Sequence, residues 1–374
     1  MRALVLTGPL AWPPLMRVVL GRDAADDCSA ATVPDAAIAA DDLCFPPLVP
    51  VAGARTDALL LEDDTGNAFE RLSFFASALG QSPVPRHVET AAGRMAALAF
   101  MAEGAAHPPQ SGWQAKGWAA RWGAIACAAA TEIMEHFDKT DPYALTARMP
   151  MILSRAVARA KAAAAPAPAQ VRSDMDGAQV ETKSCRASHD GFYLTRVCKL
   201  RHPTFAGGLS PVLTREVFVA TDAALVLPYD PVRDRLLLVE QFRMGPYGRG
   251  DPRPFVLEPV AGHVDAGETP EDAARREAQE EAGLTLRALE HISSHYCSPG
   301  CSTEFFHCYL GLADLAQAGQ GRGGLADENE DIRTHVLDFD QAMALIGTGE
   351  INIGPLVLML LWLQRERARL RAAG

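Results

Sequence analysis

The feature that most constrains this chain is the segment Gly262–Leu284, whose residues GHVDAGETPEDAARREAQEEAGL describe a loop followed by a short helix. Thr269 is a natural N-cap, and Pro270 suits the first helical position because an N–H there would be unpaired in any case. Gly283 can adopt the left-handed conformation that ends a helix. The segment therefore predicts a helix of about thirteen residues that begins at Pro270.

Three glutamates fall within one turn of that helix. Glu277, Glu280 and Glu281 are spaced i, i+3 and i+4, so their carboxylates share one face and repel each other. A solvated charged surface is the ordinary explanation of a Glu-rich helix, and i,i+4 pairs such as Glu271–Arg275 would support it. The alternative is a site for hard divalent cations, which prefer carboxylate oxygens.

The complete pattern of the segment favours the cation site. It is Gly, five residues, Glu, seven residues, then Arg-Glu-apolar-x-Glu-Glu-x-Gly-apolar, and every position fits. Average residue usage gives a chance match a probability on the order of 10⁻⁷. The segment resembles the Nudix box, so the C-terminal half of the chain resembles a Nudix hydrolase. The structural positions of the box are Gly262, Glu268, Arg276 and Gly283.

This resemblance implies a Mg²⁺ site, with Mn²⁺ as a substitute, on Glu277, Glu280 and Glu281. In relatives of this type the carbonyl before the first glycine, here that of Ala261, is a further ligand, and Arg276 is expected to pair with Glu268. A metal ion neutralises a diphosphate and lowers the pKa of a bound water. An acidic protein can then bind an anionic substrate, because the metal supplies the positive charge.

Further segments resemble the ADP-ribose pyrophosphatase branch of the superfamily, and the resemblance covers residues 180–372. They are LLLVEQFR (Leu236–Arg243), LEPVAG (Leu257–Gly262), SPGCSTE (Ser298–Glu304) and GLADENEDI (Gly324–Ile332). The implied reaction is Mg²⁺-assisted hydrolysis of ADP-ribose to AMP and ribose 5-phosphate. Because the box is common to related enzymes, a broader nucleoside-diphosphate-sugar or dinucleotide pyrophosphatase stays open, as does a non-catalytic ADP-ribose-binding module.

The same resemblance assigns two carboxylates outside the box. It implies that Glu328 is the general base and that Glu330 is another metal ligand. An isolated acidic run such as 327–331 would otherwise be interpreted as a solvated loop. A carboxylate near metal ions can take a proton from an attacking water if it lies within hydrogen-bond reach.

Substrate contacts are implied as well. Arg215 and Arg243 match positions that bind phosphate or ribose in relatives, a task that guanidinium forks suit, although each can instead form a structural ion pair. Ala220 replaces an arginine found in some relatives, which weakens one phosphate contact. The other implied contacts are Ser298, Gly300 and Glu304 on the ribose side, and Phe192 with Tyr193 against adenine.

The aromatic pair Phe192 and Tyr193 also bears on assembly. In relatives this pair comes from the other subunit of a swapped dimer, so the resemblance implies a homodimer. Aromatic pairs are more often core residues, and that alternative stays open.

An Ala- and Pro-rich stretch divides the chain. Residues 160–177 contain almost nothing large to bury, and alternating Ala and Pro favour an extended spacer. We therefore expect a domain over residues 1–164, a linker over 165–178 and a Nudix domain over 179–374. The expected fold is a C-terminal α/β/α sandwich with a mixed sheet, preceded by a smaller α+β domain.

The first domain resembles gamma-glutamylcyclotransferase-like domains over Leu4–Gly21 and Phe69–Gly80. Thr7 replaces the tyrosine of the substrate loop, Pro9 replaces its hydroxyl residue, and Ala76 replaces the acid–base glutamate. Without that carboxylate the family's proton transfer has no agent, so we expect a degenerate domain that serves packing, oligomerisation or recognition. The combination of the two domains resembles the tellurite-resistance-associated Nudix proteins of bacteria.

Charge and hydropathy exclude some partners. The 35 Lys and Arg against 46 Asp and Glu give a net charge of −11, and an acidic surface repels nucleic acid. The apolar run Leu356–Leu363 is far shorter than the ~20 residues that span a bilayer. The eight cysteines show no zinc-ligand spacing, so we expect free thiols and a cytoplasmic protein. The resemblance to Nudix hydrolases implies that the partner is a small nucleotide sugar.

Overall fold

The fold is described from a computed structural model, which covers residues 2–39, 43–63, 66–102, 113–316, 318, 321–324 and 330–373. The chain divides into two compact units, Met1–Ala167 and Pro168–Gly374, called here unit 1 and unit 2. Each is described by itself.

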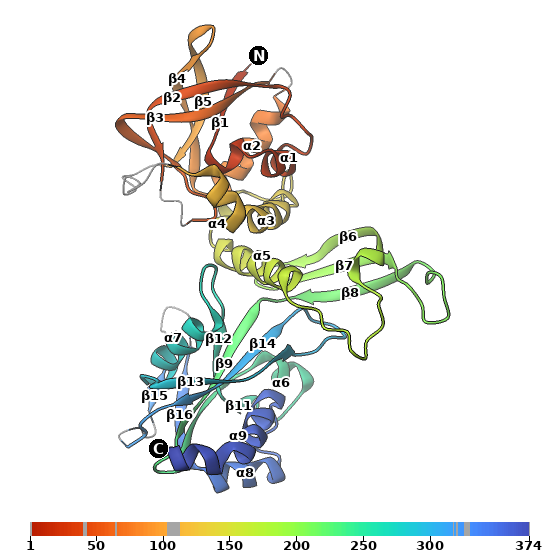
Figure 1. The fold of residues 1–374 in the computed structure, drawn as a ribbon, viewed down its shortest axis with the longest axis vertical. Helices are drawn as coiled ribbons and strands as arrows, with labels where there is room; N and C mark the ends of the chain where they lie inside the picture. The colour runs from red at the N-terminus through yellow and green to blue at the C-terminus, as the bar shows by residue number, and fades with distance from the viewer. Residues whose placement is uncertain are drawn as a thin grey trace. The chain divides into compact units, whose positions relative to one another are not determined.

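Unit 1 is built on a closed five-stranded barrel in the order β1-β3-β2-β4-β5 (Figure 1). The parallel pairing of β1 with β5 closes the barrel, while the other long ladders are antiparallel. An apolar core that includes Val5, Val33 and Val88 fills its interior. The strands are β1 (Arg2–Thr7), β2 (Cys28–Ile38), β3 (Leu48–Asp63), β4 (Gln81–Thr90) and β5 (Gly93–Ala102).

Helices pack against this barrel and form a second core with it. Trp118 and Trp122 are buried there and serve packing. The buried carboxylate of Glu132 pairs with the buried guanidinium of Arg155, joining α3 to α5. The helices are η1 (Gly8–Ala11), α1 (Pro13–Leu20), α2 (Asn67–Ala78), α3 (Ala115–Met134), α4 (Tyr143–Thr146) and α5 (Met149–Ala164).

Unit 2 contains an eight-stranded sheet whose main path runs β13-β14-β9-β10-β16-β15. The sheet is mixed, because β14 pairs parallel with β9 while its other ladders are antiparallel. β11 pairs with β10, and β12 pairs with β9. The strands are β9 (Asp222–Asp230), β10 (Arg235–Phe242), β11 (Phe255–Glu258), β12 (Val260–His263), β13 (Ala288–Tyr296), β14 (Phe305–Leu312), β15 (Arg322–Gly323) and β16 (Ile332–Asp338).

Helices cover both faces of this sheet, as the predicted α/β/α sandwich requires. α7 (Pro270–Ala282) packs on one face through small residues such as Ala274 and Ala278. α8 (Phe339–Thr348) and α9 (Gly354–Ala373) pack on the other (Figure 1). Every residue of β9 is buried, since it lies between the two layers. No helix in the described part of the chain combines the length and apolarity needed to span a bilayer.

The consecutive strands β9 and β10 form a hairpin only next to the turn that joins them. β9 and β10 pair at Arg235 with Asp230 and at Leu236 with Tyr229, after which the two strands diverge. β12 then pairs with β9, and β11 pairs with β10. This divergence brings the strand that carries Ala261 and Gly262 into the sheet beside β9.

A separate three-stranded antiparallel sheet precedes the sandwich, with short helix η2 (Gly177–Gln179) before it. Its strands are β6 (Glu181–Asp190), β7 (Leu194–Arg201) and β8 (Leu213–Val219). Cys185 and Cys198 face each other across β6 and β7 and form a disulfide. The expectation of free thiols is therefore wrong for this pair. The pairing depends on strand register, which the spacing of the cysteines does not show.

Candidate metal and substrate site

Helix α7 begins and ends at the predicted residues. The Thr269 hydroxyl accepts a hydrogen bond from the N–H of Asp272 at 3.1 Å, so it caps the first turn, and Pro270 is the first helical residue. Gly283 has a φ of 64°, and its N–H closes the last turn. These two ends fix which residues of the last turn face the β12 strand.

That last turn carries Glu277 and Glu281 toward β12. The Glu281 side chain is only 1% exposed, and its Oε2 accepts a hydrogen bond from the N–H of Ala261 at 3.2 Å. A Cβ built on Gly262 would overlap the carboxylate of Glu277, so only glycine leaves that carboxylate its place. Ala261, whose carbonyl is a predicted metal ligand, therefore lies next to the predicted carboxylates of Glu277 and Glu281.

Arg276 joins the loop to the helix and neutralises part of the carboxylate cluster. Its guanidinium binds both oxygens of Glu268, at 3.0 Å and 3.1 Å, and donates to the carbonyl of His263 at 3.0 Å. The predicted Arg276–Glu268 pair is therefore formed. The same guanidinium contacts Glu277 at 2.6 Å and Glu280 at 3.0 Å. Arg276 holds the 263–268 loop against the turn that carries the acids.

Burial and mutual repulsion raise the pKa values of the two buried acids. Burial raises the pKa of Glu281 to about 8, against the effect of the Ala261 N–H, and the charges of Glu277 and Glu330 raise it further. Burial likewise raises the pKa of Glu277 to about 7, opposed by Arg276 and assisted by Glu280 and Glu330. The guanidinium of Arg276 therefore offsets only part of the negative charge of these acids.

Glu330 lies beside the same turn of α7. The N–H of Gly324 donates to the carbonyl of Glu280 at 3.3 Å, and a Cβ on Gly323 would overlap the carbonyl oxygen of Glu281. A Cβ on Gly324 would lie 2.8 Å from the Cβ of Glu330. Close backbone packing thus brings Glu330 to the cluster. Glu328, the predicted general base, lies outside the described residues.

The donor set fits a hard divalent cation. Among the described residues no three acidic, His or Cys side chains already converge as a metal cage, and Arg276 contacts oxygens of both Glu277 and Glu280. Carboxylates are nevertheless the ligands that Mg²⁺ and Mn²⁺ prefer. Burial, and to a smaller extent the neighbouring acids, raises the pKa values of Glu277 and Glu281, and a bound cation would favour their charged forms.

Arg243 belongs to this site through a partner that the sequence analysis did not assign. It lies at the end of β10, before α6 (Met244–Arg249), and its Nε donates to Glu258 Oε2 at 2.8 Å. Burial raises the pKa of Glu258, and Arg243 opposes that rise. The positive charge of Arg243 also lowers the pKa of Glu281. The sequence could have pointed to Glu258, because it is an acidic residue in the otherwise apolar strand FVLE.

The remaining predicted substrate residues gather at the three-stranded sheet. Phe192 and Tyr193 lie exposed between β6 and β7, with ring centroids 4.9 Å apart, and Tyr193 lies 5.1 Å from Phe218 on β8. Arg215, also on β8, is exposed and donates to the carbonyl of Thr214. Among the described residues, no hydrogen bond or ion pair joins these three side chains to the acids of α7.

The loop with Ser298, Gly300 and Glu304 connects β13 to β14 and contacts β8. The N–H of Phe218 donates to the carbonyl of Cys301 at 2.8 Å, and the N–H of Thr303 donates to the carbonyl of Phe218 at 3.0 Å. Within the loop, the carbonyl of Ser298 accepts from the N–H groups of Cys301 and Ser302. This loop therefore attaches the three-stranded sheet to the edge of the sandwich.

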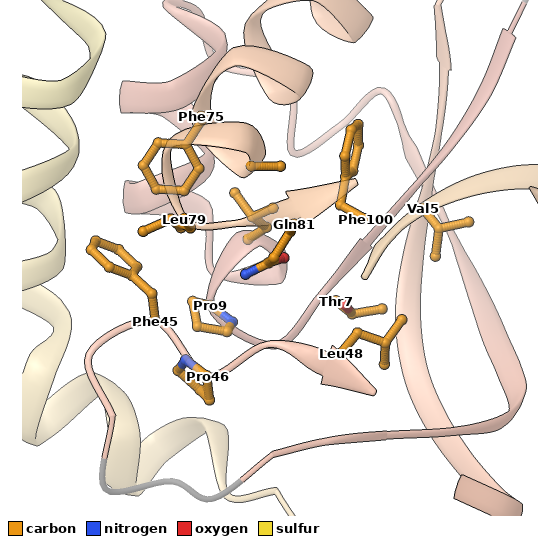
Figure 2. Close-up of a pocket in the computed structure, with 12 residues that line it drawn as sticks. Val5, Thr7, Pro9, Phe45, Pro46, Leu48, Phe75, Leu79, Gln81 and Phe100 are labelled. Atoms are coloured by element: carbon orange, nitrogen blue, oxygen red, sulfur yellow. The ribbon is translucent and has the colours of Figure 1, made fainter. Parts of the chain in front are cut away.

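In unit 1, Thr7, Pro9 and Ala76 line one cavity, and Figure 2 shows the first two of them. These are the positions that the sequence resemblance aligned with the tyrosine, the hydroxyl residue and the glutamate of cyclotransferase-like domains. The structure brings the three together, and none of them carries a carboxylate. Their neighbours in the cavity are mostly apolar.

Comparison with known proteins gives matches to unit 2. The NUDIX domain family matches residues 220–357. A Haemophilus influenzae protein named ADP-ribose pyrophosphatase is 42% identical over 185 residues, which are 49% of this chain and 85% of that protein.

Two Escherichia coli proteins add to this comparison. The ADP-ribose pyrophosphatase of strain K12 is 40% identical over 192 residues, covering 51% of this chain and 91% of its own length. The GDP-mannose pyrophosphatase of O1:K1 is 35% identical over 150 residues, covering 40% of this chain and 77% of its own. Each similarity spans more than two thirds of the relative.

Proposed function

Since the chain belongs to the Nudix family, we propose that unit 2 hydrolyses the diphosphate bond of ADP-ribose. Water attacks one phosphorus, the bridging P–O bond breaks, and the products are AMP and ribose 5-phosphate. The observation that carries the proposal is the cluster in which Glu281 and Glu277 lie against the backbone of Ala261 and Gly262, with the charge of Glu330 acting on both acids.

The chain's own residues hold the reacting groups. Glu277, Glu280, Glu281, Glu330 and the carbonyl of Ala261 would hold a divalent cation, and we favour Mg²⁺, with Mn²⁺ as a substitute. That cation, when bound, neutralises the diphosphate and acidifies a water molecule. Arg276 keeps the loop and the helix in register through Glu268.

We assign to Glu328 the role of the general base, which takes a proton from the attacking water. This assignment rests on the place of Glu328 in the GLADENEDI segment. We assign a phosphate oxygen of the substrate to Arg243, and its pairing with Glu258 and its effect on the pKa of Glu281 support this assignment. The ribose side is assigned to Ser298, Gly300 and Glu304.

The adenine contact is assigned to a second subunit. Phe192 and Tyr193 are exposed and make no hydrogen bond to the acids of α7 within the described part of the chain. A homodimer that exchanges the three-stranded sheet would supply this pair, together with Arg215, to its partner's site. Two exposed rings next to each other suit stacking on a base.

The decisive test compares substrates and one variant. The full chain is incubated with Mg²⁺ or Mn²⁺ and with ADP-ribose, GDP-mannose or NADH, and the released mononucleotide is measured. Glu281→Gln should lower the turnover of ADP-ribose at least ~100-fold, because it removes an anionic ligand. Glu350→Gln, at an exposed acid away from the site, is the control. Unchanged turnover in Glu281→Gln would refute the proposal.

A second candidate is a pyrophosphatase with broader or different nucleotide-sugar preference. The 35% identity to a GDP-mannose pyrophosphatase is the observation that favours it. Faster turnover of GDP-mannose than of ADP-ribose would select it. Tight ADP-ribose binding with Mg²⁺ but without AMP release would instead indicate a binding module.

Unit 1 is assigned no cyclotransferase chemistry, because Ala76 lines the cavity where its acid–base residue would be needed. A cytoplasmic location and an association with tellurite resistance stay predictions of the sequence resemblance. Fractionation of cells and the tellurite sensitivity of a deletion strain would test them.

A further inference from the structure

One end of the unit 1 barrel contains a narrow cavity with an open mouth. Its walls come from the end of β1, the starts of β3 and β4, and α2, with Phe75 and Phe100 on opposite sides (Figure 2). The space open to the centre of a water molecule is about 20 Å³. That space admits an end group of about three heavy atoms rather than a whole nucleotide.

Gln81 supplies the polar part of this cavity. It is the first residue of β4, its side chain points into the cavity between Pro9 and Thr7, and it is only 9% exposed (Figure 2). Among the residues that the structure describes, its side-chain amide makes no hydrogen bond, so its polar atoms face the open space of the cavity. Only water or a ligand can pair with this amide in the cavity, so a ligand that replaces the water must offer it matching hydrogen bonds.

The lining of the cavity selects against charge. Apart from Gln81 and Thr7, the described residues around it are apolar, and none is ionisable. A carboxylate or an ammonium group would lose its hydration there without gaining a counterion. A neutral group is therefore required. The group must also offer both an acceptor and a donor, because the Gln81 amide has one of each kind.

We propose that this cavity binds the terminal carboxamide of a small uncharged molecule, paired with the side chain of Gln81. The planar –CONH₂ group has three heavy atoms, and it presents its oxygen and its N–H side by side, as the opposing amide requires. The rest of the molecule extends through the mouth of the cavity toward solvent. This inference is independent of the activity proposed for unit 2.

Propionamide and propionate form a matched pair of probes, because they differ only in the polar end group. Binding of each to the full chain is measured by ligand-detected NMR. We expect saturable binding of propionamide and at least ~10-fold weaker binding of propionate. Equal binding of the two, or no binding of propionamide, would overturn the proposal.

Two variants locate the binding. Ala76→Leu fills the cavity from α2, and Gln81→Leu removes the amide while nearly keeping its volume. Each should weaken propionamide at least ~10-fold. Glu70→Leu, on the exposed side of α2, should not weaken it. If Ala76→Leu fails to fold, Gln81→Leu decides, and unchanged propionamide affinity in Gln81→Leu would overturn the proposal.

Discussion

At the residue scale, the two buried glutamates of α7 make metal binding a competition with protons. The pKa of Glu277 is raised to about 7 and that of Glu281 to about 8, first by burial and then by neighbouring acids. Without metal both are largely protonated at about pH 6, whereas a cation requires the carboxylates. Metal binding should release protons there, and apparent affinity should rise with pH up to about pH 8.

Calorimetry in buffers of different ionisation enthalpy measures those released protons directly. Glu281→Gln should release fewer protons than the parent chain at the same pH. A binding enthalpy that is the same in every buffer at about pH 6 would contradict the prediction.

Gly262 is the residue whose replacement should damage the site most selectively. Gly262→Ala places a methyl group where the Glu277 carboxylate lies, so the acid must move. We expect ~100-fold lower turnover, since small misplacements of catalytic groups have large effects on rate. Gly347→Ala is the matched control, because that glycine lies in α8 with open space around it. Equal turnover in the two variants would contradict this account.

At the element scale, the Glu132–Arg155 pair joins α3 to α5 inside unit 1. Glu132→Gln leaves the Arg155 charge buried without its counterion and should destabilise unit 1 by about 3–5 kcal/mol. The double variant Glu132→Leu/Arg155→Met should recover most of this stability, because neither charge is then buried.

Urea unfolding followed by tryptophan fluorescence reports on this pair, because four of the five tryptophans lie in unit 1. A single variant as stable as the parent chain would contradict the prediction. The four tryptophans of unit 1 are Trp12, Trp113, Trp118 and Trp122.

Some helices and strands could be predicted from the sequence, and others could not. Helix α7 was predictable from Thr269 to Gly283, because its start and stop signals are local. β4 was not, because Pro83 and Pro85 argue against a strand. The strand tolerates these prolines because β4 pairs with β2 only near Thr90. Along Pro83 and Pro85, β4 therefore has a neighbouring strand on the β5 side only.

In the candidate site, too, some contacts could be predicted from the sequence and others could not. The acids of the Nudix box follow a fixed helical spacing, so their convergence could be predicted from the sequence. The pairing of Glu258 with Arg243 depends on the register of β10 against β11, and no local pattern encodes that register. The Cys185–Cys198 disulfide was missed for a similar reason.

At the scale of the whole molecule, the two compact units are joined by an exposed segment. Residues 165–173 are exposed and belong to no helix or strand. Limited trypsin digestion should therefore cleave after Arg172 early and leave two folded fragments. Hydrolysis of ADP-ribose should remain with the fragment that begins at residue 173.

Mass spectrometry of the digest and an activity assay of the separated fragments measure this outcome. Arg172→Gln should remove that cleavage and leave activity unchanged. Loss of hydrolysis after this single cut would indicate that the catalytic unit depends on unit 1.

The last turn of α7 performs two tasks at once. Its side chains carry Glu277 and Glu281, while its carbonyl groups at Glu280 and Glu281 receive the close backbone packing of Gly323 and Gly324. Unwinding this turn would displace the acids and release the segment that leads to Glu330 in the same event. Substitutions that unwind the helix near Gly283 should therefore abolish the whole site, so that few variants there keep partial activity.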